Sequence, residues 1–190
     1  MSSGSRTTLL SPTRGSAERA RSARLSVLLL QDCITFRIYP KVTKPSVGEI
    51  RRILTHDGLA HIGRIVPDQP NSDLTTLVVM FPSMDVAHAD RLQTAWNGCL
   101  EYLNGRGLML SPFFQGSKQP AQYNPDFHPF QAPFPICAFR PMTLRDIVFI
   151  MNQDGFREYH RRFGAKYEAG AFAASTGLPQ LYQRAAEKFA

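Results

Sequence analysis

Residues 108–146 read LMLSPFFQGSKQPAQYNPDFHPFQAPFPICAFRPMTLRD. The segment contains two apolar runs, at residues 108–114 and 136–139. Each run has the length of a strand and is bounded by Gly or Pro. Between them lie residues 115–132, an eighteen-residue stretch with three prolines and several aromatic side chains. Loops of this length are usually functional or disordered, and prolines restrict the backbone, so we expect an ordered loop. The sequence therefore predicts two core strands joined by a functional loop.

The residues before this region predict further strands and helices. Residues 34–39 alternate apolar and polar side chains, which is typical of a half-buried strand, whereas the near-continuous apolar run at residues 75–81 is typical of a strand buried on both faces. A capping box at Ser46 predicts a helix start, and the His-Asp-Gly sequence at residues 56–58 is expected to interrupt or end that helix. An amphipathic helix is expected over residues 85–104.

The C-terminal part predicts three more helices. Thr143 and Asp146 form a second cap pattern, so a helix is expected directly after Thr143, followed by helices at residues 154–163 and 178–189. With a short β-rich run at residues 25–30, the predicted order is β-β-α-β-α-β-loop-β-α-α-α. Such an order predicts the α+β fold class, with a single mixed sheet layered with helices.

The basic charge of the chain is concentrated at its N-terminus. Of the net charge of +7, the first 24 residues contribute +4, since they contain five arginines and one glutamate. Residues 1–24 have almost no apolar pattern, which predicts a disordered basic tail followed by one catalytic domain over residues 25–190. The domain itself is only mildly basic, so no nucleic-acid partner is expected.

Several classes of protein are disfavoured by the sequence. The three cysteines form no CxxC pair, so no metal site is expected, and Cys137 is expected to be a buried, inert thiol in a reducing compartment. No apolar run approaches the ~18–20 residues of a membrane span, which predicts no membrane partner and a cytoplasmic location. Phosphate-loop, dinucleotide, serine-hydrolase and zinc-protease motifs are absent, so no cofactor is expected. The surplus of aromatic residues favours a homodimer.

The candidate site is drawn from the polar and aromatic residues around the long loop. His128 can act as a base near neutral pH, although an imidazole in such a turn more often hydrogen-bonds its own turn. Arg140 ends a strand and needs an anionic partner, either Asp146 in an internal salt bridge or a substrate carboxylate or enolate oxygen. Tyr123 is the expected donor, which makes His128, Arg140 and Tyr123 the predicted catalytic residues. The predicted substrate-binding residues are Asn124, Phe113, Gln115, Phe127 and Asp146.

Four short motifs in this region carry a family resemblance. They are GLML at 107–110, YNPDF at 123–127, PFP at 133–135 and FRPM at 139–142, followed by Asp146. Their order resembles the bacterial family named domain of unknown function 6875, over roughly residues 74–164. The resemblance implies no activity. The chain departs from that family near its start, where Cys33-Ile34-Thr35-Phe36 stands in place of a frequent Cys-Pro-Phe, and at His128, where the family often has other residues.

Two further resemblances suggest functions. The order of a strand, a Trp-bearing helix, a strand and a Pro-rich loop is similar to the YqcI/YcgG family, which implies a haem-dependent N-oxygenase with a histidine such as His128 as axial ligand. The chain also resembles actinobacterial carbazole-forming cyclases of natural-product biosynthesis. With no cofactor motif and with Tyr, His, Arg and Asp near one loop, we expect a cofactor-independent cyclase or aromatase. It would close a ring, oxidatively or not, in a ketone-containing small-molecule substrate by acid–base chemistry in an aromatic-lined pocket. A haem-dependent oxygenase and a non-enzymatic binding protein are the alternatives.

Overall fold

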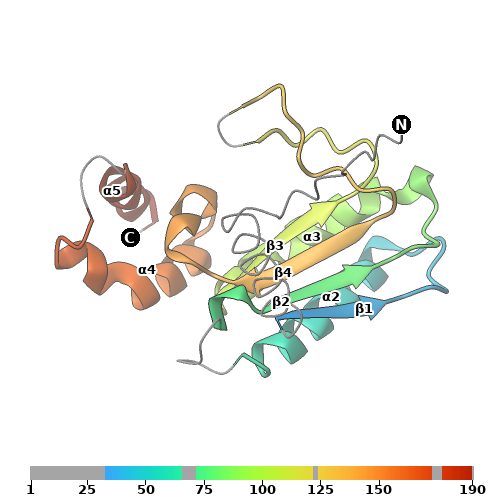
Figure 1. Ribbon diagram of the computed structural model, residues 1–190, viewed down its shortest axis with the longest axis horizontal. Coiled ribbons are helices and arrows are strands. Elements are labelled where there is room, and N and C mark those ends of the chain that lie inside the picture. Colours follow the sequence, from blue (N-terminus) through green and yellow to red (C-terminus); the bar gives the residue numbers. More distant parts are fainter. Residues whose placement is uncertain (1–32, 66–71, 122–123, 173–176, 190) are drawn as a thin grey trace, which may run out of the picture. The chain divides into compact units, whose positions relative to one another are not determined.

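The computed structural model describes residues 33–65, 72–121, 124–172 and 177–189 (Figure 1). The predicted tail at residues 1–24 and the predicted strand at residues 25–30 lie outside the described residues. With η for a 3₁₀ helix, the described elements in chain order are β1 (Ile34–Ile38), α2 (Val47–Ile62), η1 (Ser72–Leu74), β2 (Thr76–Met80), η2 (Val86–His88), α3 (Asp90–Asn104), β3 (Leu108–Phe113), β4 (Ile136–Pro141), η3 (Leu144–Phe149), α4 (Gln153–Glu168) and α5 (Leu178–Phe189).

The strands form one mixed sheet in the order β1-β2-β4-β3. β1 is parallel to β2, whereas β4 is antiparallel to both of its neighbours. A parallel pair needs a crossover connection, and α2 supplies it between β1 and β2. The antiparallel pair β3 and β4 is joined by the long loop that the sequence singled out. The predicted α+β class with a single mixed sheet is confirmed.

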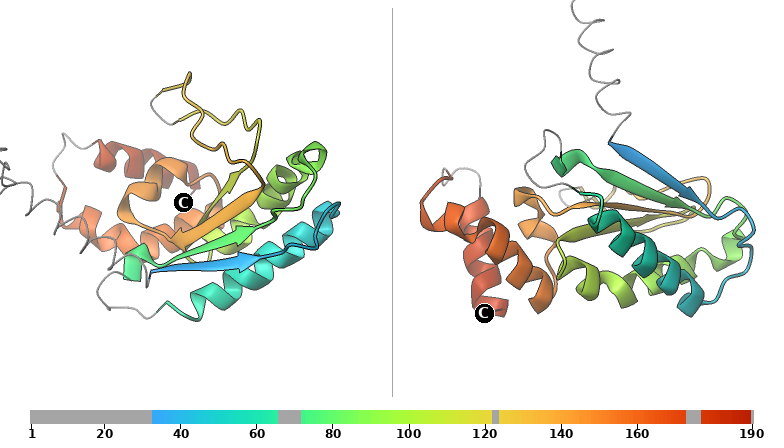
Figure 2. Two further views of the ribbon diagram at one scale, coloured as in Figure 1. Left: turned by 45° about the vertical axis from the view of Figure 1, so that its right-hand side comes forward. Right: turned by 90° about the horizontal axis from the view of Figure 1, so that it is seen from below.

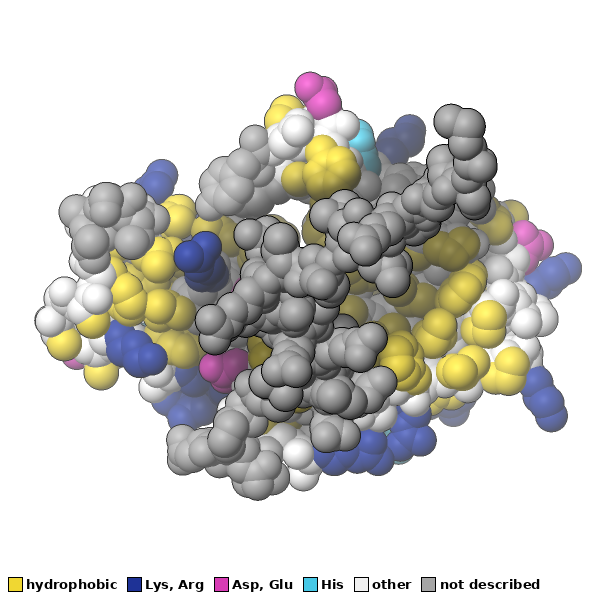
Figure 3. Space-filling view, viewed as in Figure 1, with side chains coloured by type: hydrophobic (Ala, Val, Ile, Leu, Met, Phe, Trp, Pro, Cys, Tyr) yellow, Lys and Arg dark blue, Asp and Glu magenta, His cyan; other side chains and the backbone are white. Residues whose placement is uncertain are grey.

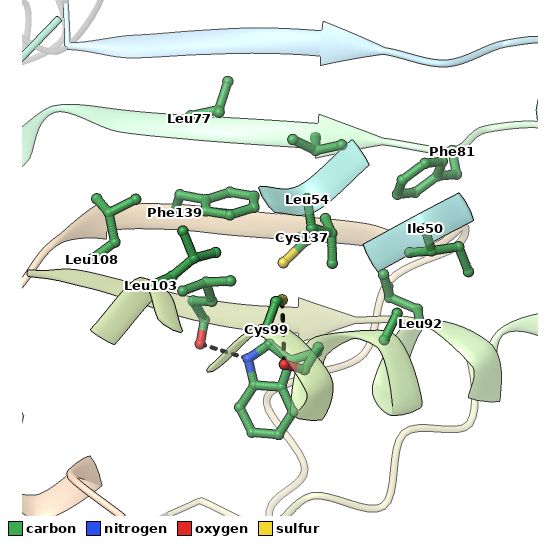
Figure 4. Close-up of a cluster of buried hydrophobic side chains, with 14 of the residues drawn as sticks. Ile50, Leu54, Leu77, Phe81, Leu92, Cys99, Leu103, Leu108, Cys137 and Phe139 are labelled. Carbon is green, nitrogen blue, oxygen red and sulfur yellow. Dashed lines mark hydrogen bonds between the residues drawn. The ribbon is translucent and has the colours of Figure 1, made fainter. Parts of the chain in front are cut away.

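The main core lies between the sheet and two helices, α2 and α3, which cover one of its faces (Figure 2). Side chains from both helices interdigitate with those of β2, β3 and β4 (Figure 4). Each large apolar side chain buried in this way contributes about 1.5–3 kcal/mol. The labelled members are Ile50, Leu54, Leu77, Phe81, Leu92, Cys99, Leu103, Leu108, Cys137 and Phe139.

A second apolar cluster holds α4, α5 and η3 together beyond one end of the sheet (Figure 1). Tyr159 of α4 is fully buried, and its hydroxyl donates to the carbonyl of Leu144 at 2.5 Å. The rings of Tyr167 and Tyr182 stack at 4.1 Å between centroids, which brings α5 against α4. Because Tyr159 ties α4 to the start of η3, this cluster fixes the segment that follows β4.

The part of the opposite sheet face that β1 and β2 form is apolar and is covered by no described helix. Ile34, Phe36 and Ile38 are 39%, 58% and 58% exposed, and hydrophobic side chains gather on this face in Figure 3. The prediction that residues 75–81 are buried on both faces is wrong, because burial alternates along β2. The apolar alternation of residues 34–39 does mark a strand, but its apolar side chains point away from the helices.

The predicted interruption of the first helix is also wrong. α2 continues through His56-Asp57-Gly58 to Ile62, and both Asp57 and Gly58 are buried within it. A Cβ on Gly58 would lie 3.2 Å from side-chain atoms of Leu103 and of Phe139. The glycine therefore allows the helix to approach α3 and the sheet closely, and this packing outweighs its low helix propensity.

Two other predicted helices begin differently from expectation. The helix predicted from Asp85 starts as the 3₁₀ turn η2, whose cap is the Asp85 carboxylate accepting from the backbone N–H of Ala87 at 3.0 Å, and α3 begins only at Asp90. The helix predicted after Thr143 is the six-residue 3₁₀ helix η3. Its predicted capping box of Thr143 and Asp146 is confirmed, as is the Ser46 cap of α2.

Gly107, just before β3, has a φ of +81°, and a Cβ there would lie 2.1 Å from Nη2 of Arg162. Gly116 has the same φ but has nothing within 4 Å of such a Cβ. We expect Gly107→Ala to lower the free energy of unfolding by about 1–2 kcal/mol and Gly116→Ala by about 1 kcal/mol, because only the former also displaces Arg162 from Glu158. Urea unfolding of both variants measures the difference. Equal losses would show that Arg162 moves aside without cost.

Candidate functional site: a cavity at the edge of the sheet

A cavity of about 250 Å³ lies along β3, the strand at one edge of the sheet. Its walls come from α3, from β3 and β4, from the β3–β4 loop, and from the end of η3 and the residues after it. Eight of its eleven lining residues are apolar, and Arg140 is the single charged one. We call it the edge cavity; its lining is Trp96, Leu100, Met109, Leu110, Ser111, Pro112, Gln119, Phe130, Arg140, Phe149 and Met151.

Trp96 connects the main core to the edge cavity. Its side chain is 8% exposed, and its indole Nε1–H donates to the backbone carbonyl of Leu110 at 3.1 Å. Leu110 lies on the edge strand β3, so the indole satisfies a carbonyl that would otherwise be left at the free edge of the sheet. The hydrogen bond therefore holds the Trp96 ring against the strand that forms the cavity floor.

The β3–β4 loop is held against β3 by hydrogen bonds that join its two ends. The backbone N–H of Phe114 donates to the carbonyl of Phe130 at 3.2 Å. The Gln131 side chain accepts from the N–H of Gly116 at 2.9 Å and donates to the carbonyl of Ser117 at 2.5 Å. These contacts fix Phe130 in the cavity wall. The described part of the loop is ordered in this sense, as the prolines predict.

Arg140, at the end of β4, forms a double salt bridge with Asp146 of η3. The Nη1–Oδ2 and Nη2–Oδ1 distances are both 2.6 Å. Oδ2 also accepts from the backbone N–H of Thr143 at 2.6 Å and from its hydroxyl at 3.0 Å. The Asp146 side chain is 2% exposed and that of Arg140 39%. The hydrogen bond to Asp146 raises the pKa of Arg140, so the guanidinium stays charged.

The structure brings only part of the predicted site together. The predicted internal salt bridge of Arg140 and Asp146 is present, and Arg140 also lines the edge cavity, so both of its expected roles are compatible with the geometry. Phe113 packs against Phe130 at 5.4 Å between ring centroids. Tyr123 lies outside the described residues. The remaining predicted residues are exposed and are not among the lining residues; they are Gln115, Asn124, Phe127 and His128.

Asn124 and His128 are both exposed on the loop and lie outside the lining of the edge cavity. Asn124 accepts a hydrogen bond from the backbone N–H of Asp126 at 3.0 Å, which is the turn-forming role common for asparagine. His128 is exposed on the same loop that carries Gln119 and Phe130. Its role as a base stays a prediction.

Several cavity residues were not predicted as site residues, chiefly Trp96, Gln119, Phe149 and Met151. In the sequence, Trp96 stands out only as one apolar residue of the helix predicted over residues 85–104. Alternation along a strand places Met109 and Ser111 on the same face of β3, but this becomes informative only once Met109 is known to pair with Arg140. Strand pairing across the long loop is not encoded in any local pattern.

The buried thiols do not contribute to the site. Cys99 and Cys137 lie in the main core, facing each other between α3 and β4 (Figure 4). Burial raises the pKa of Cys99 to about 11 and that of Cys137 well above its usual value, so both stay protonated. Burial of Cys137 is as predicted.

Neither a metal site nor a membrane-spanning helix is found among the described residues. They contain no group of three or more His, Cys, Asp or Glu side chains placed to hold a metal ion. Among the same residues, no helix combines the length and apolar composition needed to cross a membrane.

His61, near the end of α2, is 2% exposed, and its Nε2 lies 3.3 Å from the carbonyl of Thr75. Burial lowers the pKa of His61, despite the opposing effect of the Thr75 carbonyl. The unfolded chain therefore takes up a proton at higher pH than the folded one, so stability should fall as pH drops below about 6.5. His61→Gln should remove much of this dependence between pH 7.5 and 5.5, measured by urea unfolding. The control is His128→Gln, at an exposed position. If the free energy of unfolding changed with pH equally in His61→Gln and in wild type, the expectation would be contradicted.

Fold and cavity together define a class: an α+β protein with a four-stranded mixed sheet and an apolar cavity at the sheet edge. The chain belongs to the family described as Domain of unknown function (DUF6875), whose model matches residues 29–173. This match extends beyond the motifs at residues 74–164 and takes in β1 and α2. No curated protein and no solved structure matches the chain.

Proposed function

We propose that the protein binds a small, largely apolar molecule in the edge cavity. The observation that carries the proposal is a volume of about 250 Å³ whose lining is apolar apart from Ser111, Gln119 and Arg140. Ligand sites typically combine apolar walls with a few polar groups that orient the ligand. Apolar cavities of about 150 Å³ hold benzene, so the edge cavity has room for a larger ring compound. Trp96 and Phe130 offer aromatic surfaces to such a ring.

The reaction that we propose at this cavity is ring closure without a cofactor, as in natural-product biosynthesis. Arg140 supports the proposal, because it is the single charged lining residue and can stabilise an oxyanion that develops on a ketone substrate. His128 is the proposed base, carried by the loop that forms one wall. Loss of turnover in both Arg140→Ala and His128→Ala, with ligand binding retained in His128→Ala, is the expected result. Full turnover in either variant would remove that residue from the mechanism.

The cavity lining disfavours haem as the alternative. Haem iron is held by histidine, cysteinate or tyrosinate, or by methionine paired with histidine. None of the described lining residues is a histidine, cysteine or tyrosine. His61 is buried elsewhere, against Thr75, and His160 is bonded to the hydroxyl of Tyr182. His128, the axial ligand that the resemblance implies, is exposed on the loop outside the lining, so the lining itself offers no ligand for haem iron.

Trp96 gives a direct test of binding, because it is the single tryptophan of the chain and lines the cavity. Nitrobenzene, a neutral ring compound that quenches indole fluorescence on contact, should quench Trp96 along a saturable curve. Ser111→Leu adds apolar bulk inside the cavity and should leave only linear, collisional quenching. His128→Gln is the matched control and should behave as wild type. Linear quenching in wild type, or saturation unchanged in Ser111→Leu, would contradict the proposal.

A further inference from the structure

Arg140 has N–H donors that its contacts with the described residues leave unused. A guanidinium has five N–H groups in one plane. Nη1 donates one hydrogen bond to Oδ2 of Asp146 at 2.6 Å and a second to the carbonyl of Pro141 at 3.1 Å. Nη2 donates one hydrogen bond to Oδ1 of Asp146 at 2.6 Å. Asp146 thus occupies the end of the fork. Nε–H and the second Nη2–H have no hydrogen-bond partner among the described residues.

These two unused donors are adjacent and parallel. Together they form the side edge of the guanidinium, which matches the two oxygens of a carboxylate as well as the end of the fork does. Arg140 lines the edge cavity, its side chain is 39% exposed, and its Nε is not one of the buried side-chain atoms that lack a hydrogen-bond partner. The salt bridge to Asp146 therefore orients Arg140 without using up its capacity to bind a second anion.

The charge of Asp146 does not cancel this capacity. Its carboxylate accepts four hydrogen bonds, two from Arg140 and two from Thr143, so its negative charge is shared between the arginine and the start of η3. The described lining of the edge cavity contains no aspartate or glutamate. An anion in the cavity would meet two directed N–H donors and no opposing carboxylate in the wall.

Ser111 adds a second polar group at a defined spacing. Met109 pairs with Arg140 across β3 and β4, so Ser111, two residues further along β3, lies on the same sheet face as Arg140. Diagonal neighbours of this kind are about 7–8 Å apart. The Ser111 hydroxyl lines the cavity and has no hydrogen-bond partner among the described residues. This spacing is close to the span of one substituted ring.

We propose that the ligand of the edge cavity is a ring compound with a carboxylate, which docks side-on onto Nε and Nη2 of Arg140. The ring packs against Trp96 and Phe130, and an oxygen substituent on the ring reaches Ser111. This inference rests on the proposed binding function and names the class of ligand. Asp146 and Thr143 are positioning residues, because they act on the ligand only by holding Arg140.

The test compares 4-nitrobenzoate with 4-nitrobenzamide by quenching of Trp96 fluorescence at constant ionic strength. The two probes have the same ring and quenching group and differ in the charge of one substituent. Wild type should bind the benzoate about tenfold more tightly, as expected for charge-assisted hydrogen bonds. Arg140→Lys keeps a charge but loses the fork, so most of the preference should disappear. Ser111→Ala should keep it, because both probes carry the same nitro group and differ only in the substituent that faces Arg140.

A second variant tests the inference without leaving a buried charge that could prevent folding. Arg140→Gln alone leaves the buried carboxylate of Asp146 without its partner, so it is combined with Asp146→Asn, which removes that buried charge. The double variant should bind both probes equally, with the amide affinity of wild type. A tenfold preference that survives in it would overturn the inference. If wild type bound both probes saturably but without preference, the inference would be overturned and the proposed function would remain. If neither probe bound saturably, the proposed function itself would be contradicted.

Discussion

Asp146→Ala should lower the free energy of unfolding by about 3 kcal/mol, which is among the largest effects expected outside the apolar core. The carboxylate is 2% exposed and accepts four hydrogen bonds. Its removal leaves the Thr143 N–H without its partner and frees the end of the Arg140 fork. Because Arg140 is 39% exposed, water can solvate part of the released charge, which keeps the loss below the upper end of the range for buried pairs.

The control for Asp146 is an aspartate in an exposed pair. Asp154 pairs with Arg157 at 2.9 Å on the surface of α4, and the two side chains are 48% and 70% exposed. Asp154→Ala should cost no more than about 0.5 kcal/mol, since exposed pairs contribute little. Urea unfolding followed by circular dichroism measures both. A loss for Asp146→Ala as small as that for Asp154→Ala would show that the Arg140–Thr143–Asp146 cluster does not hold η3 to β4.

Trp96→Ala should cost about 3–4 kcal/mol, because it removes a large side chain that is 8% exposed and also leaves the Leu110 carbonyl without its donor. Trp96→Phe keeps one aromatic ring but loses the indole N–H and the second fused ring, so it should cost less, about 2 kcal/mol. Urea unfolding of the two variants measures both losses. If Trp96→Phe were as destabilising as Trp96→Ala, the aromatic ring that it retains would contribute nothing to stability.

Much of the fold could be predicted because its signals are local. The caps at Ser46 and at Thr143 are encoded within four residues, and the structure contains both. The partner of Arg140 was also predictable, because a strand end and a cap six residues apart leave Asp146 within reach. Local patterns failed where tertiary packing decides. Gly58 reads as a helix breaker, yet its missing side chain is what lets α2 approach Leu103 and Phe139.

The candidate site was harder to predict than the fold. No single segment of the sequence supplies the edge cavity. Its lining comes from positions 96, 100, 109–112, 119, 130, 140, 149 and 151. Residue type drew attention to His128, which is exposed, whereas the apolar wall formed by Trp96 and Met151 carries no distinctive chemistry in the sequence. In the same way, the apolar run at residues 75–81 cannot reveal that no helix of the described residues covers one face of β2.

The most direct measurement is a crystal structure of the protein with 4-iodobenzoate, in which anomalous scattering locates the iodine independently of any model of the ligand. The account predicts an iodine peak in the edge cavity, near Trp96 and Phe130, with the carboxylate within hydrogen-bonding distance of Nε and Nη2 of Arg140. An iodine peak only elsewhere on the protein, with the edge cavity holding none, would contradict it.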